Sequence, residues 1–199
     1  MSVAMHILRT LIAYSLVLAT LTAPYSRTFP KTNGGCYPLW SRFHDYCYRY
    51  FGDPMTWQRA EDYCQRYDVN DQVAHLVSIH GKKEQDFVYE LWQSTIIAPG
   101  LNRKDFEPKD VNRANGLWIG LEDQEEESHW HWTDNSTTHG FDNWRWYEPD
   151  NEDEDRTGVG EDCVHIYQHT YPWFWWYGDW NDVKCDRVMP FVCKMPIDL

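Results

Sequence analysis

The chain has 199 residues, which suits one compact domain with a real hydrophobic core and a removable or flexible end. Its formal net charge of -13 argues against nucleic acid as a partner, because phosphate binding requires a basic face. The 12 Trp and 13 Tyr residues are far above ordinary usage and predict a largely aromatic core.

Residues 1–26 have the pattern of a secretory signal peptide. Arg9 precedes an apolar run over residues 11–19, and small residues follow, so we expect cleavage near residues 23–26. The competing interpretation is a signal anchor, but the run is shorter than the ~20 apolar residues that a span needs. We therefore expect a secreted, extracellular protein without a stable membrane span, in which residues 27–35 form a short tether.

The cysteines agree with export. Their number is even, they all follow the signal segment, and no CxxC pair indicates zinc or redox chemistry. The sequence by itself leaves their pairing open. Asn135, within Asn135-Ser136-Thr137, is the candidate glycosylation site.

The first part of the domain predicts a strand pair followed by a helix. Residues 36–40 and 47–51 are rich in aromatic side chains and predict two short strands. Asp53 is a candidate helix cap, and Pro54 suits a first helical turn. The inward face of this helix would carry residues spaced at i, i+3 and i+7, namely Trp57, Ala60 and Cys64.

A predicted strand over residues 75–79 leads into a second helix. Gly81 is its candidate cap, Glu84 follows three residues later, and the buried stripe consists of Phe87, Val88, Leu91 and Trp92. Residues 95–115 predict a long loop. Further strands are predicted over residues 117–121, 129–132, 163–167 and 190–193. Two early helices followed by several strands indicate an α+β fold.

Oxygen-bearing side chains gather near the last cysteines. Glu148-Pro149-Asp150 comes first, Glu161-Asp162 precedes Cys163, and Trp180-Asn181-Asp182 precedes Cys185. Calcium takes about 6–8 oxygen ligands and tolerates irregular geometry, and Pro149 could fix a cis bend between them. The alternative is that these acidic segments are solvated loops. Without a cation, however, so many neighbouring carboxylates would repel one another, so we favour a Ca²⁺ site.

From Cys36 to Met195 the chain resembles a long-form C-type lectin domain. Eight segments in order carry this resemblance: residues 36–40, 55–57 with Ala60 and Cys64, 75–79, 118–121, 148–150, 180–182, Cys185, and 191–193. The resemblance implies a C-type lectin-like fold over residues 36–197, with two helices, antiparallel strands and long calcium-binding loops. It also implies the disulfides Cys36–Cys47, Cys64–Cys193 and Cys163–Cys185.

The same resemblance implies a calcium-dependent carbohydrate site. The positions that match the family's primary calcium and sugar ligands are Glu148, Asp150, Glu161, Asn181 and Asp182, the last also through its backbone carbonyl. A second calcium would use Asp123, Glu127 and Asp162, with the Asn151 and Asp153 region as partners.

The order Glu148 then Asp150 leaves the preferred glycan open. The family's mannose-type pattern has Glu then Asn, and its galactose-type pattern has Gln then Asp. Here both positions accept hydrogen bonds and neither donates one, which removes about 1 kcal/mol of hydrogen bonding to a sugar hydroxyl.

Other features have less specific interpretations. The aromatic run over residues 171–177 could stack on a sugar, but alternation into the core is favoured. His129 and His131 could form a zinc pair, but surface histidines are the better interpretation. Glu148 and Glu161 could imitate a glycosidase pair, yet their neighbours are calcium-ligand types, so we expect no enzyme activity.

The sequence therefore predicts a secreted lectin that recognises cell-surface or microbial glycans, as in innate immunity. Because one shallow site binds weakly, useful binding would need several sites, and a homo-oligomer would provide them. The alternative is an interaction or mineral-matrix protein that uses the same fold and binds no sugar.

Overall fold

The computed structural model describes residues 35–69, 72–96, 116–152, 158–167 and 178–197. The predicted signal segment, nearly all of the tether, residues 97–115 of the predicted loop and the aromatic run over residues 171–177 lie outside these ranges. In chain order the elements are β1 (Ser41–Phe43), β2 (Tyr46–Met55), α2 (Trp57–Cys64), β3 (Asp68–Val69), β4 (Gln72–Val73), β5 (His75–Leu76), α3 (Lys82–Ile96), β6 (Gly116–Glu122), β7 (His131–Trp132), β8 (Cys163–Tyr167), β9 (Trp180–Val183) and β10 (Met189–Pro196).

Most strands belong to one mixed sheet. Its order is β1-β2-β10-β6-β8-β9, with β5 paired to β10 and β7 paired to β6, while β3 and β4 form a separate pair. The β10–β6 pair is parallel, with Phe191 opposite Trp118, whereas the other pairs are antiparallel. The two predicted helices, the antiparallel strands and the α+β class are therefore confirmed, and the β10–β6 pair makes the sheet mixed.

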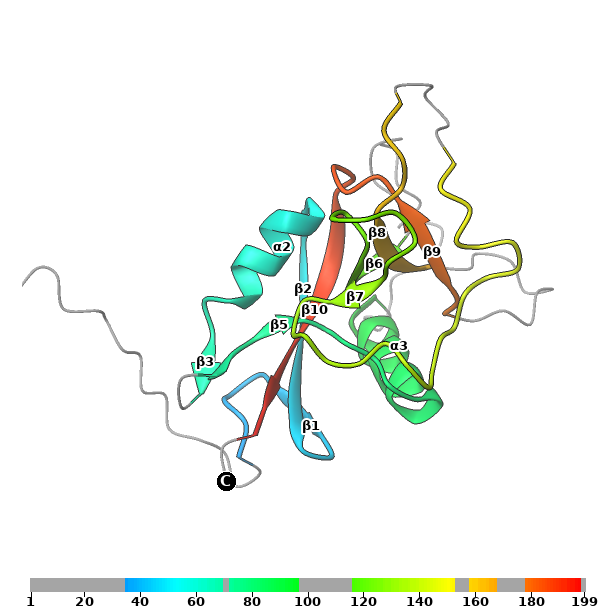
Figure 1. The fold of residues 1–199 in the computed structure, drawn as a ribbon. Coiled ribbons are helices and arrows are strands. Elements are labelled where there is room, and N and C mark those ends of the chain that lie inside the picture. Colours follow the sequence, from blue (N-terminus) through cyan, green and yellow to red (C-terminus); the bar gives the residue numbers. More distant parts are fainter. Residues whose placement is uncertain (1–34, 70–71, 97–115, 153–157, 168–177, 198–199) are drawn as a thin grey trace, which may run out of the picture. The chain divides into compact units, whose positions relative to one another are not determined.

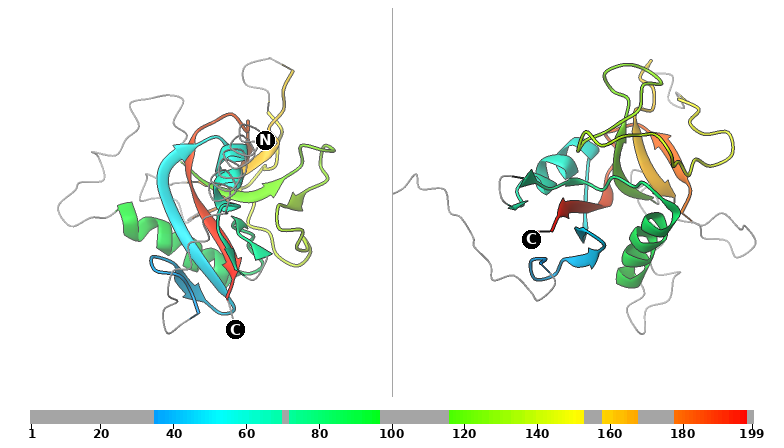
Figure 2. Two further views of the ribbon diagram at one scale, coloured as in Figure 1. Left: turned by 90° about the vertical axis from the view of Figure 1, so that its left-hand side faces the viewer. Right: turned by 60° about the horizontal axis from the view of Figure 1, so that its bottom comes forward.

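The sheet separates two hydrophobic clusters. Along β10, Phe191 and Cys193 belong to one cluster and Val192 to the other, as expected for alternating side chains. Helix α2 contributes Trp57, Ala60 and Cys64 to the first cluster, as the sequence predicted. Helix α3 contributes Val88 and Trp92 to the second, with Phe87 and Leu91 partly buried against it. Figures 1 and 2 show the two helices on opposite sides of the strands.

The first helix begins later than the sequence indicated. Asp53 and Pro54 do not cap and open it, because β2 continues to Met55, which pairs with Met189 of β10. The helix starts at Trp57 with Thr56 as its N-cap. Pairing with a strand more than a hundred residues away overrides the local helix signal at this point.

Several strand boundaries also differ from the predictions. Residues 36–40 are not a strand, and the strand that pairs with the start of β2 on the side away from β10 is β1, in which Ser41 pairs with Tyr48. The predicted strands over 75–79 and 129–132 shorten to two residues each, while α3 continues to Ile96. The strand β9 was not predicted at all.

The three disulfides join Cys36 to Cys47, Cys64 to Cys193 and Cys163 to Cys185. The pairing implied by the family resemblance is thus confirmed. The second bridge ties α2 to β10, and the third ties β8 to the segment after β9.

A buried lysine joins β10 to the start of α3. The Nζ of Lys194, which is 5% exposed, donates to Glu84 Oε1 at 2.6 Å and to the Ser78 carbonyl at 2.9 Å. The Tyr48 hydroxyl donates to the same Glu84 oxygen at 2.6 Å, and the ammonium lies 4.3 Å from the Tyr46 ring centroid. Burial pushes the pKa of Glu84 upward, but the charge and hydrogen bond of Lys194 outweigh it and lower that pKa.

A second buried ionisable group lies in β8. His165 pairs with Trp118 of β6, and the two rings meet edge to face. Gly116 approaches so closely that a Cβ there would lie 2.0 Å from His165 Nδ1, so the imidazole fills the space that this glycine leaves. Burial lowers the pKa of His165 to about 4, so the imidazole is neutral in the folded domain at physiological pH.

We expect His165 to make the fold sensitive to acid. In the unfolded chain His165 takes up a proton below its ordinary pKa near 6.5, whereas in the folded domain it stays neutral down to about pH 4. The free energy of unfolding therefore falls as pH falls from about 6.5 to about 4. The full loss is about 3 kcal/mol. Urea unfolding at pH 4 and pH 7 should show a smaller difference in His165→Leu than in the parent. His139→Gln, at an exposed histidine, should keep the parent's difference, and an unchanged difference in His165→Leu would contradict the prediction.

Candidate functional site

Strand β9 is the fixed base of the candidate site. Trp180 is buried among other tryptophans, and Asp182, two residues later, is also buried. The segment before Glu148 is held on this strand, because Trp180 N donates to the Asn143 carbonyl at 2.8 Å and Arg145 N donates to the Trp180 carbonyl at 2.9 Å. The core tryptophan therefore sets the position of both segments.

Three carboxylates from these two segments come together. One oxygen each from Glu148, Asp150 and Asp182 lies within 4.8 Å of the other two. The Asp182 carboxylate also accepts hydrogen bonds from the backbone N–H groups of Asp150 at 3.3 Å and Asn151 at 2.9 Å. The Glu148–Pro149 peptide is cis, as the sequence suggested. Residues that are 32 positions apart are thus joined through the side chain of Asp182.

The electrostatics of this cluster suit a cation. Burial raises the pKa of Glu148 to about 7, and the neighbouring charges of Asp150 and Asp182 add to this shift. Burial likewise raises the pKa of Asp182, against hydrogen bonds from backbone N–H groups. The buried Oε2 of Glu148 has no hydrogen-bond partner among the described residues. A hard cation would neutralise the repulsion and give this oxygen a partner, so these residues fit calcium.

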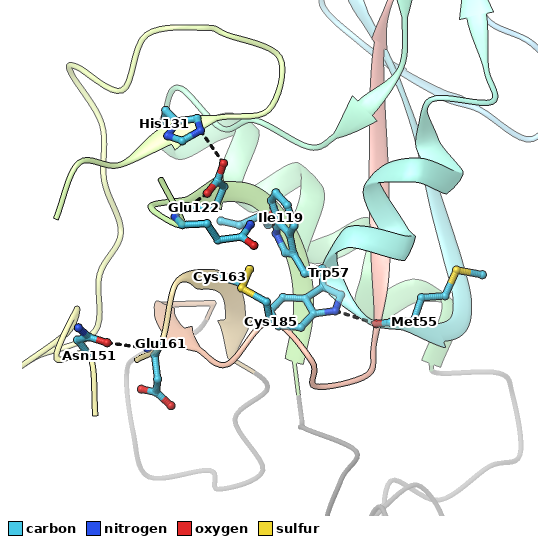
Figure 3. The surroundings of a disulfide bond; sticks show 11 residues. Met55, Trp57, Ile119, Glu122, His131, Asn151, Glu161, Cys163 and Cys185 are labelled. Atoms are coloured by element: carbon cyan, nitrogen blue, oxygen red, sulfur yellow. Dashed lines mark hydrogen bonds and ion pairs between the residues drawn. A yellow bond between two sulfur atoms is a disulfide. The ribbon is translucent and has the colours of Figure 1, made fainter. Parts of the chain in front are cut away.

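The other two predicted primary ligands are placed differently. The Asn181 side-chain amide donates to the Asp182 backbone carbonyl, so these two groups are adjacent. Glu161 is not one of the three clustered carboxylates. Its backbone N–H donates to Asn151 Oδ1 at 2.6 Å, as Figure 3 shows beside the Cys163–Cys185 disulfide. The structure thus brings three of the five predicted positions together as carboxylates, places the Asn181 amide at the Asp182 carbonyl, and connects Glu161 through Asn151.

The residues predicted for a second ion form a neighbouring acidic group. Asp123 is buried, its backbone N–H donates to the Asp162 carbonyl at 3.1 Å, and its Oδ2 accepts from Ser128 N at 2.8 Å. Its Oδ1 is buried without a hydrogen-bond partner in the described part of the chain. Burial raises the pKa of Asp123 to about 6, helped by the charges of Glu127, Asp162 and Asp182. Here too an unsatisfied buried oxygen fits a cation.

Asn151 connects the two acidic groups. Its side-chain amide donates to Glu127 Oε2 at 2.5 Å, its side-chain oxygen accepts from Glu161, and its backbone N–H donates to Asp182. From the sequence, Asn151 was predicted only as a partner of a second calcium ion. Its contacts to both groups depend on the folded loops, and no local signal in the sequence could have revealed them. Asp153, the other residue named with it, lies outside the described ranges.

His129 and His131 do not share a ligand. His131 Nε2 lies 2.5 Å from Glu122 Oε1, as drawn in Figure 3, whereas His129 Nδ1 lies 3.5 Å from Glu126 Oε1. Each imidazole faces a different carboxylate. This arrangement supports the interpretation as surface histidines over a zinc pair.

A separate cavity of about 350 Å³ lies between the segments 128–132 and 138–144. None of the predicted calcium ligands lines it. Its walls are mainly aromatic and are formed by Leu121, Ser128, His129, Trp130, Trp132, Thr138, Phe141, Asp142, Trp144 and Trp180. The carboxylate cluster, and not this cavity, is therefore the candidate metal site.

The family model "Lectin C-type domain" matches residues 53–195, which is more than half of the chain. The chain belongs to the C-type lectin domain family. Among similar proteins, an alpha-N-acetylgalactosamine-specific lectin of Patiria pectinifera is 35% identical over 160 residues, covering 79% of each chain. Echinoidin of Heliocidaris crassispina is 31% identical over 170 residues, covering 82% of this chain and 99% of echinoidin.

A solved structure supports the same assignment. The crystal structure of the C-type lectin CEL-I from Cucumaria echinata matches this chain with a TM-score of 0.62 and 29% sequence identity. The match covers 82% of this chain and 99% of the CEL-I chain. The fold that the sequence implied is therefore confirmed. Over the described residues of the lectin chain, no helix is both long and apolar enough to cross a bilayer.

Proposed function

We propose that this C-type lectin is a secreted, calcium-dependent carbohydrate-binding protein that recognises cell-surface or microbial glycans. The observation that carries the proposal is the cluster of Glu148, Asp150 and Asp182. In it, carboxylates from two segments meet, and the buried Oε2 of Glu148 has no hydrogen-bond partner within the part of the chain that the structure describes. The carbohydrate specificity in the name of the Patiria relative supports a sugar as the ligand.

The primary ion would be held by Glu148, Asp150, Glu161, Asn181 and Asp182, and a second ion by Asp123, Glu127, Asp162 and Asn151. The bound calcium supplies open coordination positions for two neighbouring sugar hydroxyls. Asn181 and the Asp182 carbonyl, which are hydrogen-bonded to each other, would supply two oxygen donors to such an ion.

The chain's own residues would orient the sugar. The Glu148 or Asp150 carboxylate would accept a hydrogen bond from one hydroxyl, whereas Glu161 would accept a hydrogen bond from the other and the Asn181 amide would donate one to it. Because Glu148 matches the mannose-type pattern and Asp150 the galactose-type pattern, we propose that the site accepts both classes of glycan. No chemical step is proposed, since a neighbouring cation would keep Glu148 ionised and a glycosidase acid must hold a proton.

Calorimetry on the oxidised, purified domain tests the proposal. We expect saturable calcium uptake, retention on immobilised galactose or mannose, and release from either by a chelator. Asp182→Asn should lose both calcium uptake and retention, because this carboxylate belongs to the cluster and also holds the 150–151 backbone. Asp142→Asn, at an exposed carboxylate outside the cluster, is the matched control and should retain both.

Two outcomes would count against the proposal. The absence of calcium uptake by the parent domain would remove its basis. Calcium uptake without retention on any glycan of an array would favour the interaction or matrix protein on the same fold. Asn135 is exposed at a turn, so mass spectrometry of the secreted protein would also show whether it carries a glycan.

A further inference from the structure

An unusual turn directly precedes the proposed ion ligand Glu148. The Glu148 N–H donates to the Arg145 carbonyl at 3.0 Å and closes a β-turn whose central residues are Trp146 and Tyr147. Tyr147 has φ +76°, and Trp146 is not among the residues with positive φ, which defines a type II turn. This position favours glycine, because a Cβ clashes with the backbone there. A tyrosine at this position is therefore strained.

The two side chains gain little from folding. Trp146 is 67% exposed and Tyr147 is 81% exposed, and neither belongs to a hydrophobic cluster. Their ring centroids lie 5.6 Å apart with an interplanar angle of 41°, so the two exposed rings lie side by side. A strained backbone that presents two aromatic rings to solvent opposes stability, and such outliers point to a binding role.

The turn is anchored to the core at its start. At its start, Arg145 N bonds to the Trp180 carbonyl, and Trp144 forms a β-bridge with Trp180 in the core. At its end is Glu148, one of the three clustered carboxylates. The aromatic pair therefore lies in the turn that leads directly into the proposed calcium site.

We infer that Trp146 and Tyr147 form a platform for the sugar residue that adjoins the calcium-bound one in an oligosaccharide. The inference rests on the proposed function and names its ligand as an oligosaccharide in place of a single sugar. The C–H face of a pyranose is apolar and packs on an aromatic ring. The adjacent Glu148 and Asp150 carboxylates repel anionic sugars, so the occupant of the platform is a neutral hexose.

Tyr147→Gly separates binding from stability. Glycine relieves the strained φ, so the melting temperature should rise, whereas loss of the ring should weaken oligosaccharide binding. The probes are lactose against methyl β-galactoside and mannobiose against methyl α-mannoside, titrated with calcium present. The ratio of disaccharide to monosaccharide affinity should fall about fivefold in Tyr147→Gly and in Trp146→Ala. Tyr147→Phe should preserve that ratio.

Leu39→Gly is a matched control. Leu39 also has a positive φ, +71°, and is 80% exposed, but it lies three residues after Cys36 and not in the 145–148 turn. Its replacement should raise the melting temperature without changing either affinity. If the parent binds monosaccharides with calcium but both platform variants keep the parent's affinity ratio, the platform is refuted and the lectin function stands. If the parent binds none of the four probes, the proposed function and the platform both fail.

Discussion

Replacing Lys194 with methionine is expected to lower the free energy of unfolding by about 3–5 kcal/mol. The ammonium is buried, and its removal leaves the Glu84 carboxylate, which is 12% exposed, without its cation. The Ser78 carbonyl also loses a donor at 2.9 Å. The methionine occupies much of the lysine's volume, so the loss measures an uncompensated buried charge and not a cavity.

Two further variants test the cause of this loss. Lys194→Met combined with Glu84→Gln should recover part of the stability, because the second change removes the stranded charge. Lys82→Met breaks an exposed ion pair with Asp86 on the same helix and should cost no more than about 1 kcal/mol. Urea unfolding curves at pH 7 supply the comparison. Equal losses of unfolding free energy in Lys194→Met and Lys82→Met would show that the buried ion pair contributes no more to stability than the exposed one.

Removing the Cys64–Cys193 disulfide is expected to cost about 5 kcal/mol, because it closes a loop of 129 residues in the unfolded chain. The reason is that the unfolded state gains conformational freedom in proportion to the logarithm of loop length. Cys64 joins helix α2 to Cys193 in β10, so the paired alanine variant should unfold at a much lower denaturant concentration than the parent.

The costs of removing the other two disulfides can be compared with this value. The Cys163–Cys185 separation of 22 residues predicts a cost of about 3.4 kcal/mol, and the Cys36–Cys47 separation of 11 predicts about 2.8 kcal/mol. Three double-alanine variants should therefore rank in the order of their loop lengths. A reversed order would mean that packing around each bridge outweighs chain entropy.

The fold was predictable where short patterns and family segments coincide. Trp57, Ala60 and Cys64 were placed on the buried face of α2 from spacing alone, and the disulfide pairs followed from the resemblance. The start of α2 was not predictable, because Asp53 and Pro54 carry a helix signal that β2–β10 pairing overrides. The burial of Lys194 depends on its contact with Glu84, which lies 110 residues away in the sequence. The sequence alone does not show that these two residues meet.

The candidate site was likewise predictable only in part. Glu148, Asp150 and Asp182 were named from their residue types and order, and the structure brings their carboxylates together. The contacts of Asn151 and the exposed turn of Tyr147 depend on backbone geometry in long loops. Loop conformation depends on distant partners such as Trp180, so these features appear only after folding.

Some of the proposed ion ligands lie on a core strand and others on a loop. This difference affects which of them can change in evolution. Asn181 and Asp182 follow the core residue Trp180 on strand β9, so the packing of the core sets their backbone positions. Glu148 and Asp150 stand on a loop near solvent, where exchanges are tolerated. Residues 146–150 can thus change at little cost to the fold, whereas the two proposed ligands on β9 are tied to the packing of the core.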